Sequence, residues 1–526
     1  MENKKTKIIS IASIIALALT LVTATYAYFM AQTGEGKSTD IKINANTVDT
    51  FTFEAGSALN LSLNQENFAS GKGNQTGTTV AKAMLTANNK TNTATEHYYL
   101  YLNISNNTFT YSIDNNTPEI LLSIKDGSNN EITTLTGLTY KTVTDGKGAS
   151  IKGFDITTKS GLITILNNRE ITTTSSKTEQ WNVTVTFVNY NSNQAGNAGK
   201  NFSAKLMIQK EKIPTVLSDV CTNENNLATC ITTLSNKSEP SIVNIYHHTS
   251  SLVNGAGDNS YRYAGASDQV NNFVCFGSTT KPCPTDNLYR IIGVIDGKVK
   301  LIKYDYATSA LLGTNGDYYG SETPNASYYK GSLTSIDKYY WNYKAANSSS
   351  NIWSTSLLNK TNLNTNYLNN IGTTWSNLIE DTTWKVSGHT TPNVTPSEMY
   401  TAEITNATKT YGPNNGTSKI GLTYVSDYGF AASPSAWTTT LRNYGGNDVN
   451  GTSIKTINWM YMGHNEWTIS PYSSHSNVVF ILDYGGNLNS NFAVNGYGSR
   501  PVLYLKASVL YAGGSGTKDS PITLVV

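Results

Sequence analysis

The chain has 526 residues, more than one hydrophobic core usually organises, so we expect two or three domains. Only 14% of the residues are charged, and the formal net charge is +2. Phosphate backbones are bound by clustered Lys and Arg, and the sequence has no such cluster, so we expect no nucleic-acid partner. The polar residues are mostly Asn, Thr, Ser and Gly, which together with 33 tyrosines favour strands and turns over helices.

The N-terminus has the pattern of an export signal. Lysines within the first seven residues precede an uncharged apolar run from Ile8 to Phe29. The small residues in Ala-Thr-Tyr-Ala predict cleavage after Ala27, with Ala31 as an alternative, so residues 1–33 are expected to be a signal peptide. If it is not cut, the run is long enough to anchor the protein in a membrane. Either way, the positive N-terminus predicts a secreted or cell-surface chain that meets the membrane only through this segment.

The four cysteines form two close pairs in the sequence, Cys221 with Cys230 and Cys275 with Cys283. In an exported chain, this even count and short spacing predict two local disulfides. Free thiols or a zinc site are the alternatives, but zinc would need closer CxxC pairs and a histidine at ligand spacing. We therefore expect no metal and no cofactor.

Residues 38–210 have the pattern of a β-sandwich. Ile41, Ile43 and Ala45 alternate with polar residues, and several short segments rich in β-formers follow at regular spacing. The expected strands are Val80–Thr86, Tyr98–Ile104, Ile120–Lys125, Leu162–Leu166, Asn182–Val188 and Ser203–Gln209. Such strands without a strong helix between them predict an aligned sandwich.

Three features of this half resemble a known family. They are Thr25-Tyr26-Ala27-Tyr28-Phe29 at the signal junction, the segment 44–49, and an expected hairpin from Trp181 to Ile208. They resemble camelysin and the fibre-forming biofilm matrix proteins of Gram-positive bacteria. The resemblance implies a jelly-roll-like sandwich, an accessory signal peptidase and extracellular assembly. Some relatives are described as metalloproteases, but His97 is the only histidine in 38–210, and a zinc protease needs several converging ligands.

Residues 211–286 are expected to form a connector that carries the cysteine pairs, with a short helix within Val216–Leu234. His247 and His248 are adjacent there, but neighbouring side chains diverge on a strand or helix and no third ligand is near. We therefore expect structural roles for both histidines.

Residues 287–526 are expected to form a second domain of the α+β type. Two apolar segments flank Asp296-Gly297, which predicts a hairpin, and helical spacing recurs in Ser354–Ile371. In order, Trp353-Ser354, Gly421–Ser426, Trp467–Pro471 and Arg500–Leu505 resemble the C-type-lectin-like domains related to formylglycine-generating enzymes. The whole chain is then mainly β with a minor α+β part, and the resemblance implies that its loops form the binding surface.

The candidate ligand-binding residues lie in the aromatic, Gly- and Asn-rich stretch 458–505. Aromatic faces can stack on sugars and amides can bond hydroxyls. The candidates are Trp459, Tyr461, His464, Asn465, Asp483, Asn487, Asn489 and Tyr497. Asp483, Asn487 and Asn489 could also surround a calcium ion, although their sequence favours a Gly-rich hairpin turn. We expect Trp467 in the core and Arg500 bonded to loop carbonyls.

The sequence offers no catalytic set. The enzyme branch of the lectin-like family works through cysteines, and none follows Cys283. Ser473, Ser474 and His475 are adjacent, but no nucleophile elbow or positioned acid accompanies them. The expected function is therefore a non-enzymatic, adhesin-like binder of extracellular glycan or protein. The alternative is a structural subunit that self-assembles into a fibre or biofilm matrix through the edge strands of its sandwich.

Overall fold

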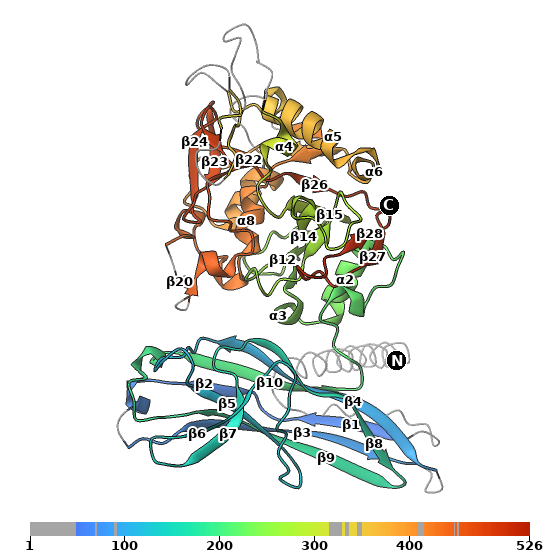
Figure 1. The fold of residues 1–526 in the computed structure, drawn as a ribbon, viewed down its shortest axis with the longest axis vertical. Coiled ribbons are helices and arrows are strands. Elements are labelled where there is room, and N and C mark those ends of the chain that lie inside the picture. The colour runs from blue at the N-terminus through green and yellow to red at the C-terminus, as the bar shows by residue number, and fades with distance from the viewer. Residues whose placement is uncertain are drawn as a thin grey trace, which may run out of the picture. The chain divides into compact units, whose positions relative to one another are not determined.

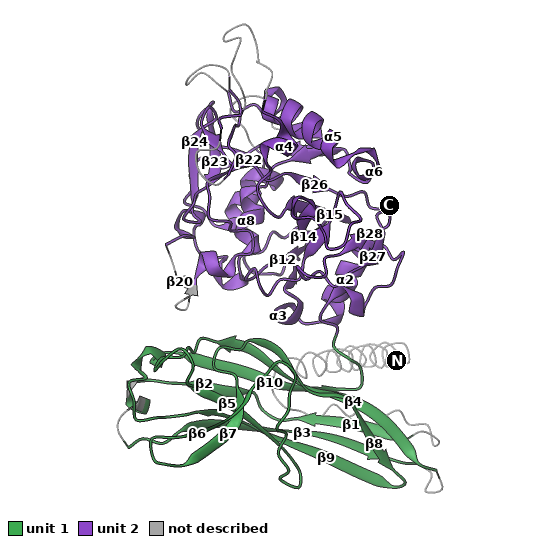
Figure 2. Ribbon diagram, in the orientation of Figure 1, with its two compact units in different colours: residues 1–213 green, residues 214–526 purple. Residues whose placement is uncertain are grey.

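The computed structural model describes residues 49–526, except for 69–70, 89–91, 315–328, 332–335, 344–349, 408–414, 447 and 450–451. The expected signal peptide with Ala27 and the alternating residues 41–45 lie outside the described residues. The chain divides into two compact units, one ending at Ile213 and the other starting at Pro214 (Figure 2). Strands outnumber helices in both units, which confirms the mainly β fold.

The first unit consists of two antiparallel sheets (Figure 1). The six-stranded sheet has the order β1 (Thr50–Ala55), β3 (Gln75–Thr86), β9 (Ser176–Phe187), β5 (Ile120–Asp126), β7 (Ser150–Asp155) and β6 (Tyr140–Thr144). The four-stranded sheet has the order β2 (Leu59–Ser62), β10 (Asn201–Gln209), β4 (Ala94–Asn107) and β8 (Gly161–Thr173).

The two sheets bury their apolar faces against each other. Val183 and Val185 of β9 share one buried cluster with Leu100 and Leu102 of β4, in the other sheet. These residues alternate with more polar ones along each strand, as expected when one face of a sheet is buried. Each strand expected from residue 80 to residue 209 overlaps an observed one, so the sandwich is confirmed.

The expected hairpin from Trp181 to Ile208 is wrong. Its two strands lie in different sheets, since β9 pairs with β3 and β5 while β10 pairs with β2 and β4. The loop between them crosses from one sheet to the other over a buried carboxylate, Glu119. Gln194 and Asn197 in this loop each donate a 2.8 Å hydrogen bond to Glu119. These long-range bonds hold the crossover, and the connection from residue 188 to residue 200 is longer than the roughly 2–5 residues usual in a hairpin loop.

The second unit is built around one antiparallel sheet. Its order is β11 (Ile245–His247), β12 (Tyr261–Tyr263), β14 (Leu288–Ile295), β15 (Lys298–Lys303), β26 (Val502–Tyr504) and β19 (Ile420–Gly421), and β13 (Phe273–Cys275) also pairs with β14. Three of these strands come from 211–286, the segment expected to be a connector. From Pro214 on, that segment is part of the second unit.

Smaller elements surround this sheet. A second sheet contains β22 (Glu466–Pro471), β23 (Val478–Leu482) and β24 (Leu488–Phe492). The short strand pairs are β16 (Tyr339–Tyr340) with β25 (Gly496–Tyr497), β17 (Thr382–Lys385) with β18 (Asn415–Ser418), β20 (Asp448–Val449) with β21 (Thr452–Ser453), and β27 (Tyr511–Gly513) with β28 (Thr523–Leu524).

The α-helices and π-helical segments of the second unit are short. They are α2 (Leu227–Lys237), α3 (Pro240–Val243), α4 (Ser309–Leu312), the π-helical segment Leu358–Tyr367, α5 (Leu368–Ile371), α6 (Thr373–Ser376), α7 (Pro396–Tyr400), the π-helical segment Thr401–Thr405 and α8 (Val425–Ala431). Among the described residues, no helix is both long and apolar enough to cross a membrane.

Two local predictions about this unit are confirmed. Disulfides join Cys221 to Cys230 and Cys275 to Cys283. Strands β14 and β15 form a hairpin whose turn, Asp296-Gly297, has φ values of 50° and 72°. Positive φ at both turn residues is the geometry that an Asp-Gly pair accommodates best. This turn carries Asp296 to the mouth of the pocket described below.

Candidate functional site

The aromatic candidates in 458–505 are mostly engaged inside the second unit. Trp459 is 1% exposed, and its indole N–H donates a 2.8 Å hydrogen bond to the carbonyl of Tyr263. Its ring also faces the guanidinium of Arg290 at 4.8 Å. Tyr497 packs edge-on against Trp467 and accepts a hydrogen bond from Asn491. The face of Trp459 is therefore not available to a partner at the surface.

The polar candidates hold one loop together. The hydroxyl of Tyr461 donates to the carbonyl of Tyr484, and the side-chain oxygen of Asn465 accepts from the Tyr484 N–H, each at 2.7 Å. His464 packs edge-on against Tyr306. These bonds anchor the β23–β24 turn, whose tip residue Tyr484 is 72% exposed.

Of the three residues considered for calcium, Asp483 and Asn487 lie in the β23–β24 turn and Asn489 lies in β24. One carboxylate oxygen of Asp483 accepts hydrogen bonds from the N–H groups of Gly485 and Asn487, each at 2.9 Å. Asn487 accepts from Gly445, and Asn489 accepts from the next residue along β24. Across the described part of the chain, no group of three or more His, Cys, Asp or Glu residues could hold a metal ion.

Arg500 is a buried structural cation. It is bonded twice to the carboxylate of Glu466, at 2.7 Å each, and once to the carbonyl of Met460, at 2.8 Å. Trp467 is 1% exposed and donates to the carbonyl of Tyr339, so it is a core residue as predicted. None of the eight candidate residues lines the pocket that the structure shows at the central sheet.

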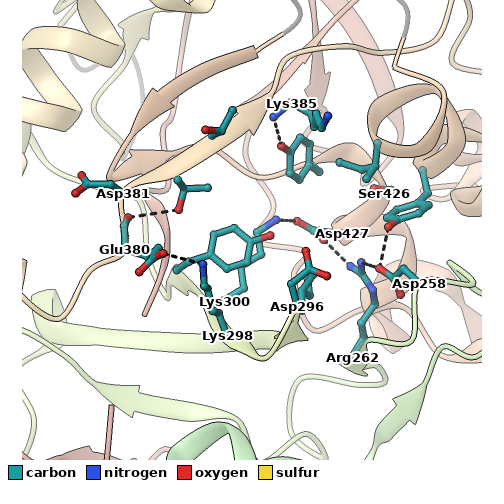
Figure 3. A pocket seen from close by; sticks show the side chains of 17 residues that line it. Asp258, Arg262, Asp296, Lys298, Lys300, Glu380, Asp381, Lys385, Ser426 and Asp427 are labelled. Carbon is teal, nitrogen blue, oxygen red and sulfur yellow. Dashed lines mark hydrogen bonds and ion pairs between the residues drawn. The ribbon is translucent and has the colours of Figure 1, made fainter. Parts of the chain in front are cut away.

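A pocket of about 400 Å³ lies elsewhere in the second unit, at the central sheet (Figure 3). Its walls come from segments far apart in the sequence: the loop before β12, the β14–β15 hairpin, β17, the α7 region, α8 and β26. The lining residues are Asp258, Arg262, Ile295, Asp296, Lys298, Lys300, Glu380, Asp381, Thr382, Thr383, Lys385, Tyr400, Ile404, Tyr424, Ser426, Asp427 and Tyr504.

The floor of this pocket is a chain of alternating buried charges. Asp427 lies between two cations: one oxygen is 2.7 Å from Arg262 Nη1, and the other is 2.5 Å from Lys300 Nζ. Arg262 continues the chain through Nη2 to Asp258, at 2.8 Å. The side chains of Arg262, Lys300 and Asp427 are at most 3% exposed. Buried charges are tolerated when they are paired in this way.

Burial and pairing act against each other in the pKa values of these floor groups. Burial lowers the pKa of Lys300, and the adjacent Asp427 opposes that shift. For Arg262, burial disfavours the cation, but Asp258 and Asp427 outweigh it and raise its pKa. For Asp258, burial disfavours the carboxylate, but Arg262 and hydrogen bonds from Ser260 outweigh it and lower its pKa. Arg262 and Asp258 are therefore held as an ion pair.

Aromatic rings surround the floor lysine. Lys300 Nζ lies 4.3 Å from the ring centre of Tyr424, 5.1 Å from that of Tyr504 and 5.7 Å from that of Trp384. An ammonium over aromatic faces is stabilised by the ring quadrupoles. Gly421 is required for this packing, because a Cβ there would lie 2.7 Å from the Trp384 ring.

A second buried carboxylate fixes the helix that carries Asp427. Glu403 is fully buried and accepts hydrogen bonds from the N–H groups of Val425 and Ser426, at 2.9 and 3.0 Å, and from the hydroxyl of Ser470. It thereby caps the start of α8, which places Asp427 over the central sheet. Burial raises the pKa of Glu403 to about 7.

The rim of the pocket is more open than the floor. Lys298 forms a 2.7 Å ion pair with Glu380, and both are about one-third exposed. Asp296 and Lys385 are exposed, and within the described residues neither side chain has a bonded partner. In Figure 3 the carboxylate of Asp296 points towards the middle of the pocket. The pocket thus combines a floor of paired, buried charges, walls of tyrosine, and two rim charges, Asp296 and Lys385, that are unpaired within the described residues.

The sequence predicted the hairpin that bears Asp296 and Lys300 but not the pocket. One signal was available: Lys300 lies between apolar residues in a strand whose residues 299–303 are all buried. Asp427 likewise lies in an entirely buried helix. A charged residue in such a segment requires a partner, although the sequence does not say which one.

No protein-family model matches the chain, and no curated protein shows significant similarity to it. The resemblances to matrix-fibre and lectin-like families therefore stay predictions from short motifs. The pocket is the feature from which a function can be argued.

Proposed function

We propose that the protein is exported and acts outside the cell as a non-enzymatic, adhesin-like binder of a glycan or protein ligand. The observation that carries this proposal is the pocket of about 400 Å³ with its charged floor. The two disulfides support export, because such bonds persist in oxidising compartments. The signal-like N-terminal sequence agrees with that location.

The pocket has properties that favour binding. Its floor charges are fixed by mutual pairing, so little conformational entropy is lost there when a ligand enters. The rim groups Asp296 and Lys385 remain free to bond a ligand. The tyrosine walls supply both apolar faces and hydroxyls.

The pocket favours a glycan over a folded protein as ligand. Its volume lies near the lower end of the range for small-molecule sites, roughly 300–1,000 Å³. A stable protein–protein interface instead covers about 800 Å² on each partner. A terminal sugar of a glycan chain matches the concave shape better than a broad protein surface does.

The test is an array of glycans and extracellular-matrix proteins probed with the purified chain lacking residues 1–27. Thr383→Trp, a change on an exposed β17 residue that lines the pocket, should abolish the hits by filling the mouth. Thr142→Trp, on exposed β6 of the first unit, is the matched control and should keep them. No hit, or hits that survive Thr383→Trp, would contradict the proposal.

A fibre-forming subunit is the second candidate function. Strand β1 ends the six-stranded sheet and, among the described residues, pairs only with β3. An edge strand of this kind can accept a strand from another chain. Deleting residues 28–40 should then abolish oligomers in size-exclusion chromatography, and oligomers that persist unchanged would exclude assembly by this route.

A further inference from the structure

We infer that the pocket selects a sugar that carries a protonated amine, and that Asp296 is the residue that makes this selection. The inference rests on the proposed function, since it names the class of ligand that the same pocket takes. It depends on three observations: the balance of charges in the pocket, the position of Asp296, and the hydroxyl groups on the walls.

The first observation is that most of the lining charges are already neutralised. Five carboxylates and four cations line the pocket. Lys300 and Arg262 are bonded to Asp427, Arg262 also to Asp258, and Lys298 to Glu380. The charges left over are two carboxylates and one ammonium.

These remaining charges favour a cation. Asp296 has no bonded partner in the described structure, and Asp381, 73% exposed, has only Lys419 at 3.7 Å. Lys385 is the single lining cation without a carboxylate partner among the described residues. A ligand carboxylate would therefore meet net negative charge, whereas an ammonium group would be attracted.

The second observation is the position of Asp296. The β14–β15 turn carries it over the pocket, and its carboxylate points towards the middle (Figure 3). The negative charge of Asp296 also acts on Tyr504: burial is the main cause of the raised pKa of Tyr504, and Asp296 adds to it. An ammonium bound beside Tyr504 would meet both a carboxylate and an aromatic face.

The third observation distinguishes a sugar from a simple amine. The hydroxyl of Tyr424 accepts a hydrogen bond from the Lys385 N–H at 2.8 Å, and its own proton remains to be donated. The hydroxyl of Tyr504 has no hydrogen-bond partner among the described residues. The hydroxyls of Thr382 and Thr383 are bonded to the Glu380 carbonyl and the Thr417 hydroxyl, and each keeps the capacity for a further hydrogen bond. Ring hydroxyls of a sugar can pair with these groups, while an alkyl amine would leave them unused.

The experiment is calorimetric titration of the whole exported chain with methyl glycosides of glucosamine, glucose and glucuronic acid, and with lysine amide. The expected order of affinity is glucosamine, then glucose, then glucuronic acid, with glucosamine also ahead of lysine amide. The preference for glucosamine over glucose should be roughly tenfold, the usual effect of one charge-assisted hydrogen bond. It should weaken as salt is added.

The key variant is Asp296→Asn. Asn has the same shape and tolerates the positive φ of this turn, so the hairpin should be preserved while the charge is lost. The variant should bind glucosamine and glucose equally. Asp268→Asn removes an exposed charge from the same unit outside the pocket and should keep the preference.

The outcomes separate this inference from the proposed function. Equal binding of glucosamine and glucose by the unmodified chain, or a preference that survives Asp296→Asn, would overturn the inference alone. Lysine amide binding as tightly as glucosamine would overturn the sugar assignment. If none of the four probes binds while pocket-dependent array hits remain, the inference fails and the proposed function stands. If the array is empty as well, both fail.

Discussion

Two buried groups near the pocket should respond to acid in opposite directions. They are His248, which packs against Phe430 and Trp437, and Glu403, which caps α8. Between pH 6.5 and pH 4.5 their effects on the stability of the second unit should nearly cancel. Substituting either one should therefore expose the pH dependence that the other causes.

His248 makes the fold less stable in acid. Its Nδ1 accepts a 2.9 Å hydrogen bond from the Ala256 N–H. Burial lowers its pKa from 6.5 to about 3, and Arg262 adds to that shift. The unfolded chain therefore binds this proton more readily than the folded one. Stability is fully present above pH 6.5 and is lost as the pH falls towards 3.

Glu403 acts with the opposite sign. Burial raises its pKa from 4.5 to about 7, and the hydrogen bonds from Ser426 and Ser470 only partly offset this. The folded chain therefore takes up this proton before the unfolded one does. The stabilisation is fully present below pH 4.5 and is lost as the pH rises through 7.

The size of each effect follows from linkage. Each pH unit that lies between the folded and unfolded pKa values changes the free energy of unfolding by about 1.4 kcal/mol. The interval from pH 6.5 to pH 4.5 lies within both shifts, so each group contributes about 3 kcal/mol with opposite sign. Glu403→Gln should therefore lose about 3 kcal/mol on acidification through this interval, and His248→Gln should gain about as much.

Urea denaturation followed by tryptophan fluorescence is the suitable assay. Seven of the eight tryptophans lie in the second unit, so the signal reports mainly on it. With a slope of about 3 kcal/mol per molar urea, the midpoint of each variant should move by about 1 M between the two pH values. Asp268→Asn, an exposed acid, is the control. If both variants keep the pH dependence of the unmodified chain, the reasoning from burial is refuted.

Three further predictions concern the pocket and its support. Asp427→Asn leaves the buried Lys300 without its carboxylate partner and should cost about 3–5 kcal/mol in urea denaturation. The exposed Asp381→Asn should cost under about 0.5 kcal/mol, and similar losses for the two variants would contradict the charged-floor interpretation. Cys221→Ser removes the disulfide to Cys230 and should lower the free energy of unfolding by about 2–4 kcal/mol. An unchanged melting curve would argue against that disulfide. Trp459→Phe removes the hydrogen bond to Tyr263 and should cost about 1–3 kcal/mol of stability, while the glycan affinity measured by calorimetry stays unchanged. If affinity falls while stability is unchanged, Trp459 takes part in binding.

The sequence alone determined the features that depend on neighbouring residues. Alternating apolar residues in Asn182–Val188 predicted the strand that became part of β9. Asp296-Gly297 predicted the β14–β15 turn, because few other residue pairs accept positive φ at both positions. The short spacing of Cys221 and Cys230 likewise predicted their disulfide. Each of these depends on a pattern that spans only a few residues.

Only the tertiary structure decided which distant residues meet. Arg262, Lys300 and Asp427 lie far apart in the sequence, and their pairing depends on how β12, β15 and α8 pack together. The residues around Trp459 in the sequence have the composition of a binding loop, yet Trp459 itself is packed in the core. Local periodicity and turn chemistry specify strands and turns, whereas the convergence of charges on a pocket requires the long-range contacts that form only when the whole unit folds.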